Sequence, residues 1–335
     1  MRENMTLYPI KMNGKYGYID NKGEIAIEPK FDYAEDFKGS FAIVGIGENF
    51  GFSDKEGNLI GNADYENIFD FSEGLAAVDV NGKKGYIDET GKMVITPSYD
   101  EANEFSEELA AVKLGYKWGY IDKKGKMVIE PKFLDAFSFS EGLALVQHGG
   151  KLGYIDKSGK NVIEPQYDYA YGFSEGFAAV GIKGKIGYIN KTGELVIQPK
   201  YEAGNDFNEG LAAVEEDDKY GFINTQGEII IPLKYDWADD FSEGLAVVAI
   251  EDKYGFIDKK GNEVISIKYD NVDVMSEGLL GVEIDGKWGY IDINGNLIIE
   301  PAFDEAAKFI DGVAKVEVEE RIRYMNKNGE YIWKR

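Results

Sequence analysis

A unit of 34 residues repeats along the chain without insertion or deletion, and this period restricts the folds that the chain can adopt. A glycine marks the same point in successive units: Gly17, Gly51, Gly85, Gly119, Gly153, Gly187, Gly221, Gly255 and Gly289. An aromatic residue follows it, and recurs in a partial last unit at residues 323–335: Tyr18, Phe52, Tyr86, Tyr120, Tyr154, Tyr188, Phe222, Phe256, Tyr290 and Tyr324. So constant a period indicates that each unit packs on its neighbours. We therefore predict a single repeat domain over residues 1–335.

Each unit reads as three short β-strands, which in one unit fall at residues 117–122, 126–130 and 143–146. The first strand is rich in aromatic and β-branched residues and ends at a turn. Asp122 opens that turn and can bond the backbone, while Gly125 closes it with a positive φ. Pro131 has no N–H, so the second strand is predicted to stop there. The bridge 132–139 is expected to be an irregular crossing or one turn of 3₁₀ helix.

The same period is also found in helical tetratricopeptide repeats, but the residue types exclude them. The chain has 41 glycines, about four per unit, and prolines follow many of the second strands. No apolar stripe with a helical period of 3.6 residues runs through such a unit. The fold is predicted to be all-β, a tandem array of ten units.

Two arrangements of the array stay open. The apolar residues 7–10 match the third strand of a unit, so they could complete the last unit and close a propeller-like ring. Alternatively they begin the first of ten whole units in an open superhelical, solenoid-like array. Propellers usually have four to eight blades, which favours the open form.

A Trp-Gly pair stands at the anchor glycine in two units, as Trp118-Gly119 and Trp288-Gly289. Together with the ten in-phase units, this pair resembles the WG-repeat (KWG repeat) family of tandem bacterial β-repeat proteins. The resemblance implies generic interaction repeats without a shared catalytic motif.

The formal net charge of −24 argues against nucleic acid and anionic membranes as partners, because both bind clustered Lys and Arg. No apolar run is long enough to span a membrane. The first ten residues lack the apolar core of a signal peptide, so a cytoplasmic location is expected. A surface or secreted location is the alternative if a leader has been removed.

The sequence offers no catalytic, cofactor or metal site. His148 is the single histidine and there is no cysteine, so a zinc site is not expected. The turn aspartates lack the spacing of an EF-hand calcium loop, and Asn replaces them in several units. No phosphate-binding glycine motif is present, so no cofactor is predicted.

Two rows of repeated side chains have alternative interpretations. The Ser-Glu-Gly glutamates either bond backbone amides at their turns or form an acidic stripe that docks a basic partner: Glu73, Glu107, Glu141, Glu175, Glu209, Glu243 and Glu277. The invariant aromatic row is interpreted as a core ladder between units rather than a platform for sugars. Partner contacts are expected where the units differ, at Lys84, Trp118, Tyr220, Trp237 and Trp288.

These patterns favour a non-catalytic scaffold that presents an extended acidic surface to a protein partner. A glycan- or cell-wall-binding module is the alternative, and a hydrolase with a centrally assembled site is less favoured. Self-association through the ends of the array is a further expectation of the open form.

Overall fold

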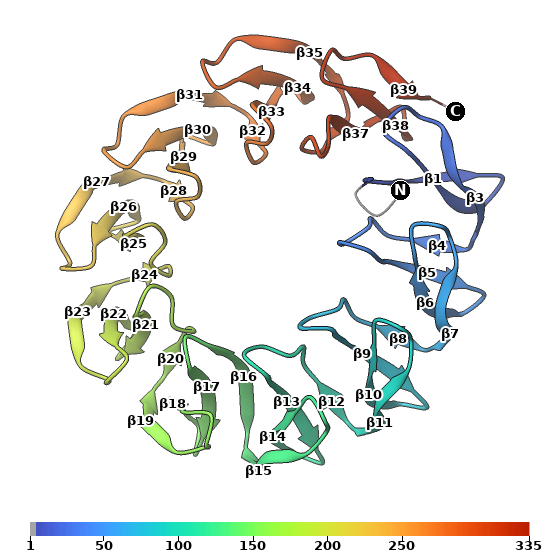
Figure 1. The fold of residues 1–335 in the computed structure, drawn as a ribbon. Helices are drawn as coiled ribbons and strands as arrows, with labels where there is room; N and C mark the ends of the chain where they lie inside the picture. The colour runs from blue at the N-terminus through green and yellow to red at the C-terminus, as the bar shows by residue number, and fades with distance from the viewer. Residues whose placement is uncertain (1–4, 335) are drawn as a thin grey trace. The chain divides into compact units, whose positions relative to one another are not determined.

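The computed structural model describes residues 5–334, which form β-strands and turns without a helix (Figure 1). Residues 1–4 and 335, the two ends of the predicted domain, lie outside the described residues. The strands form nine four-stranded antiparallel sheets and one three-stranded sheet. None of residues 5–334 belongs to a helix that could cross a membrane.

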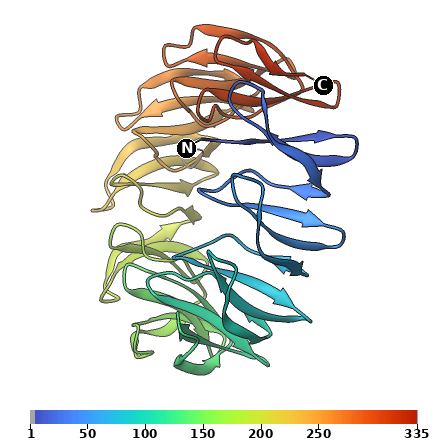
Figure 2. The same ribbon diagram turned by 45° about the vertical axis from the view of Figure 1, so that its right-hand side comes forward.

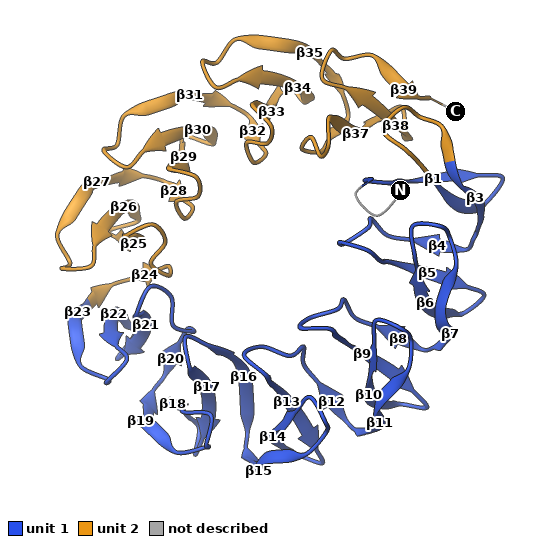
Figure 3. Ribbon diagram, in the orientation of Figure 1, with its two compact units in different colours: residues 1–18, 26–199 blue, residues 19–25, 200–335 orange. Residues whose placement is uncertain are grey.

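The chain divides into two compact units, coloured separately in Figure 3. Unit 1 comprises residues 1–18 and 26–199, and unit 2 comprises residues 19–25 and 200–335. The turn of the first sheet thus belongs to unit 2, where Gly23 lies against the backbone of Ile332.

The strands of the first five sheets lie mainly in unit 1. They are β1 (Tyr8–Met12), β2 (Lys15–Ile19) and β3 (Ile25–Phe31); β4 (Tyr33–Ala34), β5 (Ala42–Ile46), β6 (Asn49–Ser53) and β7 (Leu59–Tyr65); β8 (Asn67–Ile68), β9 (Leu75–Val80), β10 (Lys83–Asp88) and β11 (Met93–Tyr99); β12 (Glu101–Ala102), β13 (Leu109–Leu114), β14 (Lys117–Asp122) and β15 (Met127–Phe133); β16 (Asp135–Ser140), β17 (Leu143–His148), β18 (Lys151–Ile155) and β19 (Asn161–Tyr167).

The sixth sheet completes this set with β20 (Tyr169–Ala170), β21 (Phe177–Ile182), β22 (Lys185–Asn190) and β23 (Leu195–Tyr201). The sheets of unit 2 are β24 (Ala203–Gly204), β25 (Leu211–Glu216), β26 (Lys219–Asn224) and β27 (Ile229–Tyr235); β28 (Trp237–Ala238), β29 (Leu245–Ile250), β30 (Lys253–Asp258) and β31 (Glu263–Tyr269); β32 (Asn271–Val272), β33 (Leu279–Ile284), β34 (Lys287–Asp292) and β35 (Leu297–Phe303); β36 (Glu305–Ala306), β37 (Val313–Val318), β38 (Arg321–Asn326) and β39 (Tyr331–Trp333).

The predicted hairpin turn is confirmed. Asp122 Oδ1 accepts hydrogen bonds from the backbone N–H groups of Lys124 and Lys126, both at 2.9 Å. Gly125 has a φ of 77°, in the left-handed region that favours glycine. The same pair of side-chain bonds recurs in the other Asp and Asn turns, for example at Asp156 and Asn190.

The predicted strand end at proline is wrong, because β15 continues through Pro131 to Phe133. A β-bulge explains why: Trp118 pairs with Phe133 and Tyr120 pairs with Ile129, so extra residues of β15 face Gly119. A proline inside the bulge does not need to donate a ladder hydrogen bond.

Nine of the sheets have one strand more than the three expected. In the unit analysed above, the bridge predicted to be irregular or 3₁₀ forms β16, which pairs with β17. In the other four-stranded sheets the equivalent strand has two residues, such as β28. Four antiparallel strands in each of nine sheets are typical of the blades of a β-propeller, which confirms the propeller-like alternative as the fold class (Figures 1 and 2).

The first strand does not complete the last sheet. β1 pairs in the order β1-β2-β3, and the last sheet contains its own four strands β36–β39. Each repeat therefore begins with the strand that was predicted to be third in the unit. The strands predicted to be first and second follow it along the chain.

The core lies between successive sheets. One cluster joins Tyr120 and Ile129 of one sheet with Phe133, Phe139 and Val146, of which the last two belong to the following sheet. The Tyr120 ring lies edge-on to Phe139 with centroids 5.1 Å apart, and its hydroxyl donates to the Phe137 carbonyl at 2.8 Å. The row from Tyr18 to Tyr324 is buried throughout. The core-ladder interpretation is confirmed, and these rings cannot stack on sugars.

Candidate functional site

The Ser-Glu-Gly glutamates reach the turn of the next sheet rather than their own. Both carboxylate oxygens of Glu107 accept from the Gly142 backbone N–H at 3.1 Å, and Lys157 Nζ lies 3.1 Å from Oε2. The same link is made by Glu73, Glu141, Glu209 and Glu277, with lysine Nζ atoms at 2.8–3.2 Å. These five carboxylates therefore join adjacent sheets, so we expect them to be less available to a partner than unpaired acidic groups.

Glu243 supplies a natural comparison, because Ile293 stands at the position that holds the lysine in these links. We expect Glu209→Gln to lower the free energy of unfolding by about 0.5 kcal/mol at low salt, since it removes the ion pair with Lys259. Glu243→Gln should change it much less. Urea unfolding of both variants at two salt concentrations checks this, and equal losses would show that the lysine contributes nothing.

The four predicted aromatic contacts differ in exposure. Trp118, Trp288 and Tyr220 are half-buried and pack against the clusters between sheets. Trp237, on the short strand β28, is 41% exposed. Trp237 is therefore the best placed of the four to meet a partner.

Trp237 lines a small pocket in unit 2, between the sheet β28–β31 and the sheet β32–β35. The pocket has a volume of about 160 Å³, and its lining includes Trp237, Asp239, Val247, Tyr254, Val272 and Asp273. The rings of Trp237 and Tyr254 meet edge to face with centroids 6.1 Å apart. We call this site the Trp237 pocket.

Asp239 and Asp273 were not predicted as site residues. They occupy the same position of adjacent units, 34 residues apart, where other units hold Phe69, Phe137 or Tyr171. Because equivalent positions of stacked units lie side by side, two consecutive acidic residues at a varying position were the signal that could have revealed the pocket.

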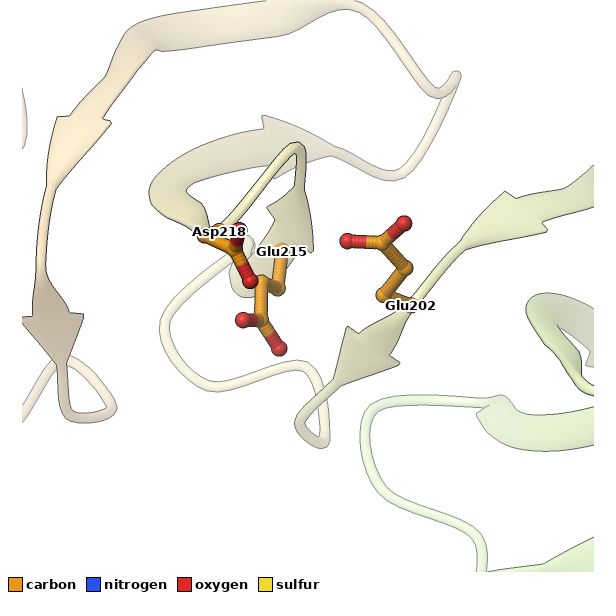
Figure 4. Close-up of side chains that lie close together, drawn as sticks. All are labelled: Glu202, Glu215 and Asp218. Carbon is orange, nitrogen blue, oxygen red and sulfur yellow. The ribbon is translucent and has the colours of Figure 1, made fainter.

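The hairpins between the second and third strands of each four-stranded sheet in unit 2 carry many acidic residues. Their tips hold Asp217 and Asp218, Glu251 and Asp252, Asp285, and Glu319 and Glu320, all exposed. One oxygen from each of Glu202, Glu215 and Asp218 lies within 4.8 Å of the others (Figure 4). Glu202 and Asp218 are exposed and Glu215 is half-buried, and we interpret the group as a concentration of negative charge.

A family model described as a WG containing repeat matches nine successive segments: residues 16–49, 50–83, 85–118, 118–151, 153–185, 186–220, 220–254, 254–288 and 288–321. The chain belongs to the WG-repeat family. No curated protein matches its sequence.

Solved structures resemble this WG-repeat protein at low identity. A crystal structure of a eukaryotic initiation factor is 11% identical, with a TM-score of 0.59 over 98% of this chain and 95% of that one. Dihydro-heme d1 dehydrogenase NirN in complex with DHE gives 14% identity and a TM-score of 0.43 over 78% and 71% of the two chains. An extracellular domain of a putative hybrid two-component system from B. thetaiotaomicron gives 10% and 0.31 over 97% and 55%. Of these three, only the initiation factor has a TM-score high enough to bear on the fold, and none of the likenesses concerns function.

The glycine of the WG pair has a packing reason. A Cβ atom on Gly119 would lie 2.4 Å from the Ile129 carbonyl oxygen and 2.8 Å from the Pro131 nitrogen, inside the bulge. The tryptophan of the pair is less constrained: Trp118 is half-buried, and Lys113 Nζ lies 5.7 Å from its ring centroid. This difference explains why the WG repeats here keep the glycine and vary the residue before it.

Proposed function

We propose that this WG-repeat protein is a non-catalytic binding scaffold whose acidic hairpins in unit 2 dock a basic protein partner. The single observation that carries the proposal is the uneven distribution of charge among equivalent hairpins. In unit 1 the tips are mostly uncharged, for example Asn81-Gly82, Gly115-Tyr116 and Gly149-Gly150. All of these turns connect the second and third strands of a four-stranded sheet. Because mostly uncharged residues form the turn in unit 1, the acidic residues of unit 2 are not needed to form it.

The nearby lysines do not neutralise the hairpins. Lys219, Lys253 and Lys287 begin the strands that follow three of them, and each forms an ion pair with an aspartate of the short-strand segment. Those aspartates are Asp236, Asp270 and Asp304, and the hydrogen bond from the lysine lowers the pKa of each. The hairpin carboxylates are left as excess negative charge, which attracts and orients a basic partner.

The glutamates of these hairpins also carry backbone strain. Glu251, Glu319 and Glu320 have φ of 49°, 54° and 61°. This left-handed conformation suits Gly, Asn and Asp, and is less favourable for glutamate. Keeping glutamates in these turns thus costs stability, which supports a role in binding.

The probe for this proposal is an octapeptide of alternating lysine and serine, compared with one of alternating glutamine and serine. The basic peptide should bind the full chain at 20 mM salt and lose most of its affinity at 0.5 M, because exposed charges are screened. Asp217→Asn, Asp218→Asn, Glu251→Gln and Glu319→Gln together should weaken binding about fivefold or more.

The matched control removes four exposed charges from unit 1: Glu28→Gln, Glu56→Gln, Glu89→Gln and Glu130→Gln. It should change the affinity less than about twofold. An equal loss in both variants, or no binding of the basic peptide at low salt, would refute the proposal.

A glycan-binding module remains the second candidate, favoured by the exposed Trp237 beside Tyr254. Aromatic rings next to carboxylates can also stack on sugars and bond their hydroxyls. Hits on a glycan array that disappear in Trp237→Ala would support this candidate over the first.

A further inference from the structure

We propose that the Trp237 pocket accepts an arginine side chain of the basic partner. This inference rests on the proposed function and assigns the residue that the pocket recognises. The pocket combines two aromatic rings, three apolar valines and two carboxylates in a volume of about 160 Å³. A guanidinium group with its aliphatic stem has the matching properties: a flat cation that stacks on rings and several N–H donors for carboxylates.

The two carboxylates are held in place and have acceptor capacity left. Asp239 Oδ1 accepts from the Asp240 backbone N–H at 2.9 Å, and Asp273 Oδ1 accepts from the Val274 backbone N–H at 2.8 Å. Over residues 5–334 neither carboxylate has an ion pair with a lysine or arginine. A cation entering the pocket would therefore find acceptors that are already oriented and not neutralised.

The chain itself places a cation at the corresponding position of another sheet. In the sheet β8–β11, Lys84 stands where Tyr254 stands in the sheet β28–β31, and Phe69 stands where Asp239 does. Lys84 Nζ lies 5.0 Å from the Phe69 ring centroid and 2.7 Å from Asp79 Oδ1. The ammonium group of the chain's own Lys84 thus contacts both the aromatic ring and the carboxylate of that site.

The Trp237 pocket lacks this internal cation. At the position equivalent to Asp79, the sheet β28–β31 holds the small residue Ala249, which pairs with Trp237 on the neighbouring strand. The acidic groups come instead from Asp239 and, from the next sheet, Asp273. Aromatic rings and carboxylates again lie together, here without a lysine among them, so a cation from a partner would complete the set.

Two features favour arginine over lysine. The walls are aromatic faces and edges, on which a planar guanidinium stacks better than a compact ammonium. The acceptors come from two different sheets, and five N–H donors in a fork can serve both, whereas the ammonium of lysine is a strongly hydrated point charge.

The test uses the full chain and the pentapeptide Gly-Gly-Arg-Gly-Gly with blocked ends, followed by calorimetry or by NMR of the indole N–H signals. Peptides with lysine or neutral citrulline in place of arginine are the comparison. We expect the citrulline peptide to bind at least about tenfold more weakly and the lysine peptide to fall between the two. Equal binding of the lysine peptide would overturn the assignment to arginine.

Three variants locate the site. Trp237→Ala, Asp239→Asn and Asp273→Asn should each weaken the arginine peptide by about tenfold, with unchanged melting temperature. Glu300→Gln removes the same charge from an exposed position of unit 2 that lies outside both the pocket and the hairpins, and should change the affinity less than about twofold. Equal effects of Glu300→Gln and the pocket variants would overturn the pocket.

The result separates this inference from the proposed function. If the lysine–serine octapeptide still depends on the hairpins while the pocket variants bind arginine normally, the pocket inference fails and the scaffold proposal stands. If the pentapeptide enters the pocket while the octapeptide ignores the hairpins, the pocket stands and the hairpin proposal fails.

Discussion

Replacing Gly119 with alanine is expected to lower the free energy of unfolding by about 3 kcal/mol. The added Cβ would lie 2.4 Å from a backbone carbonyl oxygen and 2.8 Å from the Pro131 nitrogen, so the bulge of β15 would have to open. Both neighbours are backbone atoms, which cannot turn away as the end of a flexible side chain can. Urea unfolding of the full chain measures the loss.

The control for this prediction is Gly172→Ala. A Cβ atom on Gly172 meets nothing within 4 Å, and its φ is outside the left-handed region. We expect no loss of stability there, and a gain of up to about 0.5 kcal/mol because alanine restricts the unfolded chain. A similar loss at both positions would mean that the bulge does not select glycine.

Asp206→Asn is expected to stabilise the protein by about 1–2 kcal/mol at pH 7. Burial, together with the charge of Asp240, raises the pKa of Asp206 to about 6. Among residues 5–334, Asp206 Oδ1 finds no hydrogen-bond partner, while both oxygens of Asp240 accept from the side-chain amides of Asn205 and Asn208. The ionised form of Asp206 is therefore poorly stabilised in the folded state. The expected gain in unfolding free energy is smaller than the full pKa shift implies, because the Asp206 side chain is only half-buried.

The sign of the pH dependence follows from the raised pKa. The folded protein binds a proton more readily than the unfolded chain, so the contribution of Asp206 to stability rises as the pH falls from 7 through about 6 toward 4. In Asp206→Asn this contribution is absent, and the difference in unfolding free energy between variant and parent should shrink on acidification. Asp36→Asn, at the equivalent exposed position of unit 1, is the matched control, and an equal pH trend in both variants would contradict the prediction.

Much of the fold could be predicted because its determinants are local. The turn at Asp122 needs only a side chain that reaches the backbone two and four residues on and a glycine with positive φ. The regular return of an aromatic such as Tyr120 similarly indicates a core position. Such signals lie within a few residues and repeat in every unit, so the period reveals them.

Other features could not be predicted because they depend on packing between strands. The strand β28 has two residues, too few to show a periodic pattern. Pro131 looked like a strand end, and only the pairing of Trp118 with Phe133 shows that a bulge accommodates it. The carboxylate of Glu107 bonds Gly142 in the next sheet, a distance of 35 residues that local turn chemistry does not suggest.

The candidate site was predicted only in part, for the same reason. Trp237 was identified as a varying aromatic residue, but its partners in the pocket come from two sheets. Asp273 contributes to the pocket because stacking brings it next to the sheet that holds Trp237. The glutamate row had two interpretations, backbone bonds at its own turns or an acidic surface, and the structure shows Glu107 and Glu141 bonding the backbone at the turn of the next sheet.

The glutamate links have a consequence for how such chains change length. Glu107 contacts Gly142 and Lys157, and Glu141 contacts Gly176 and Lys191 at the same offsets. Excision of residues 120–153 would bring Glu107 opposite Gly176 and Lys191, which already form this joint with Glu141. Loss or duplication of one whole period within unit 1 therefore recreates a joint that the protein already contains. Genes of this kind can gain or lose a whole blade in a single recombination step, because the new neighbours meet through a glutamate joint of the same kind.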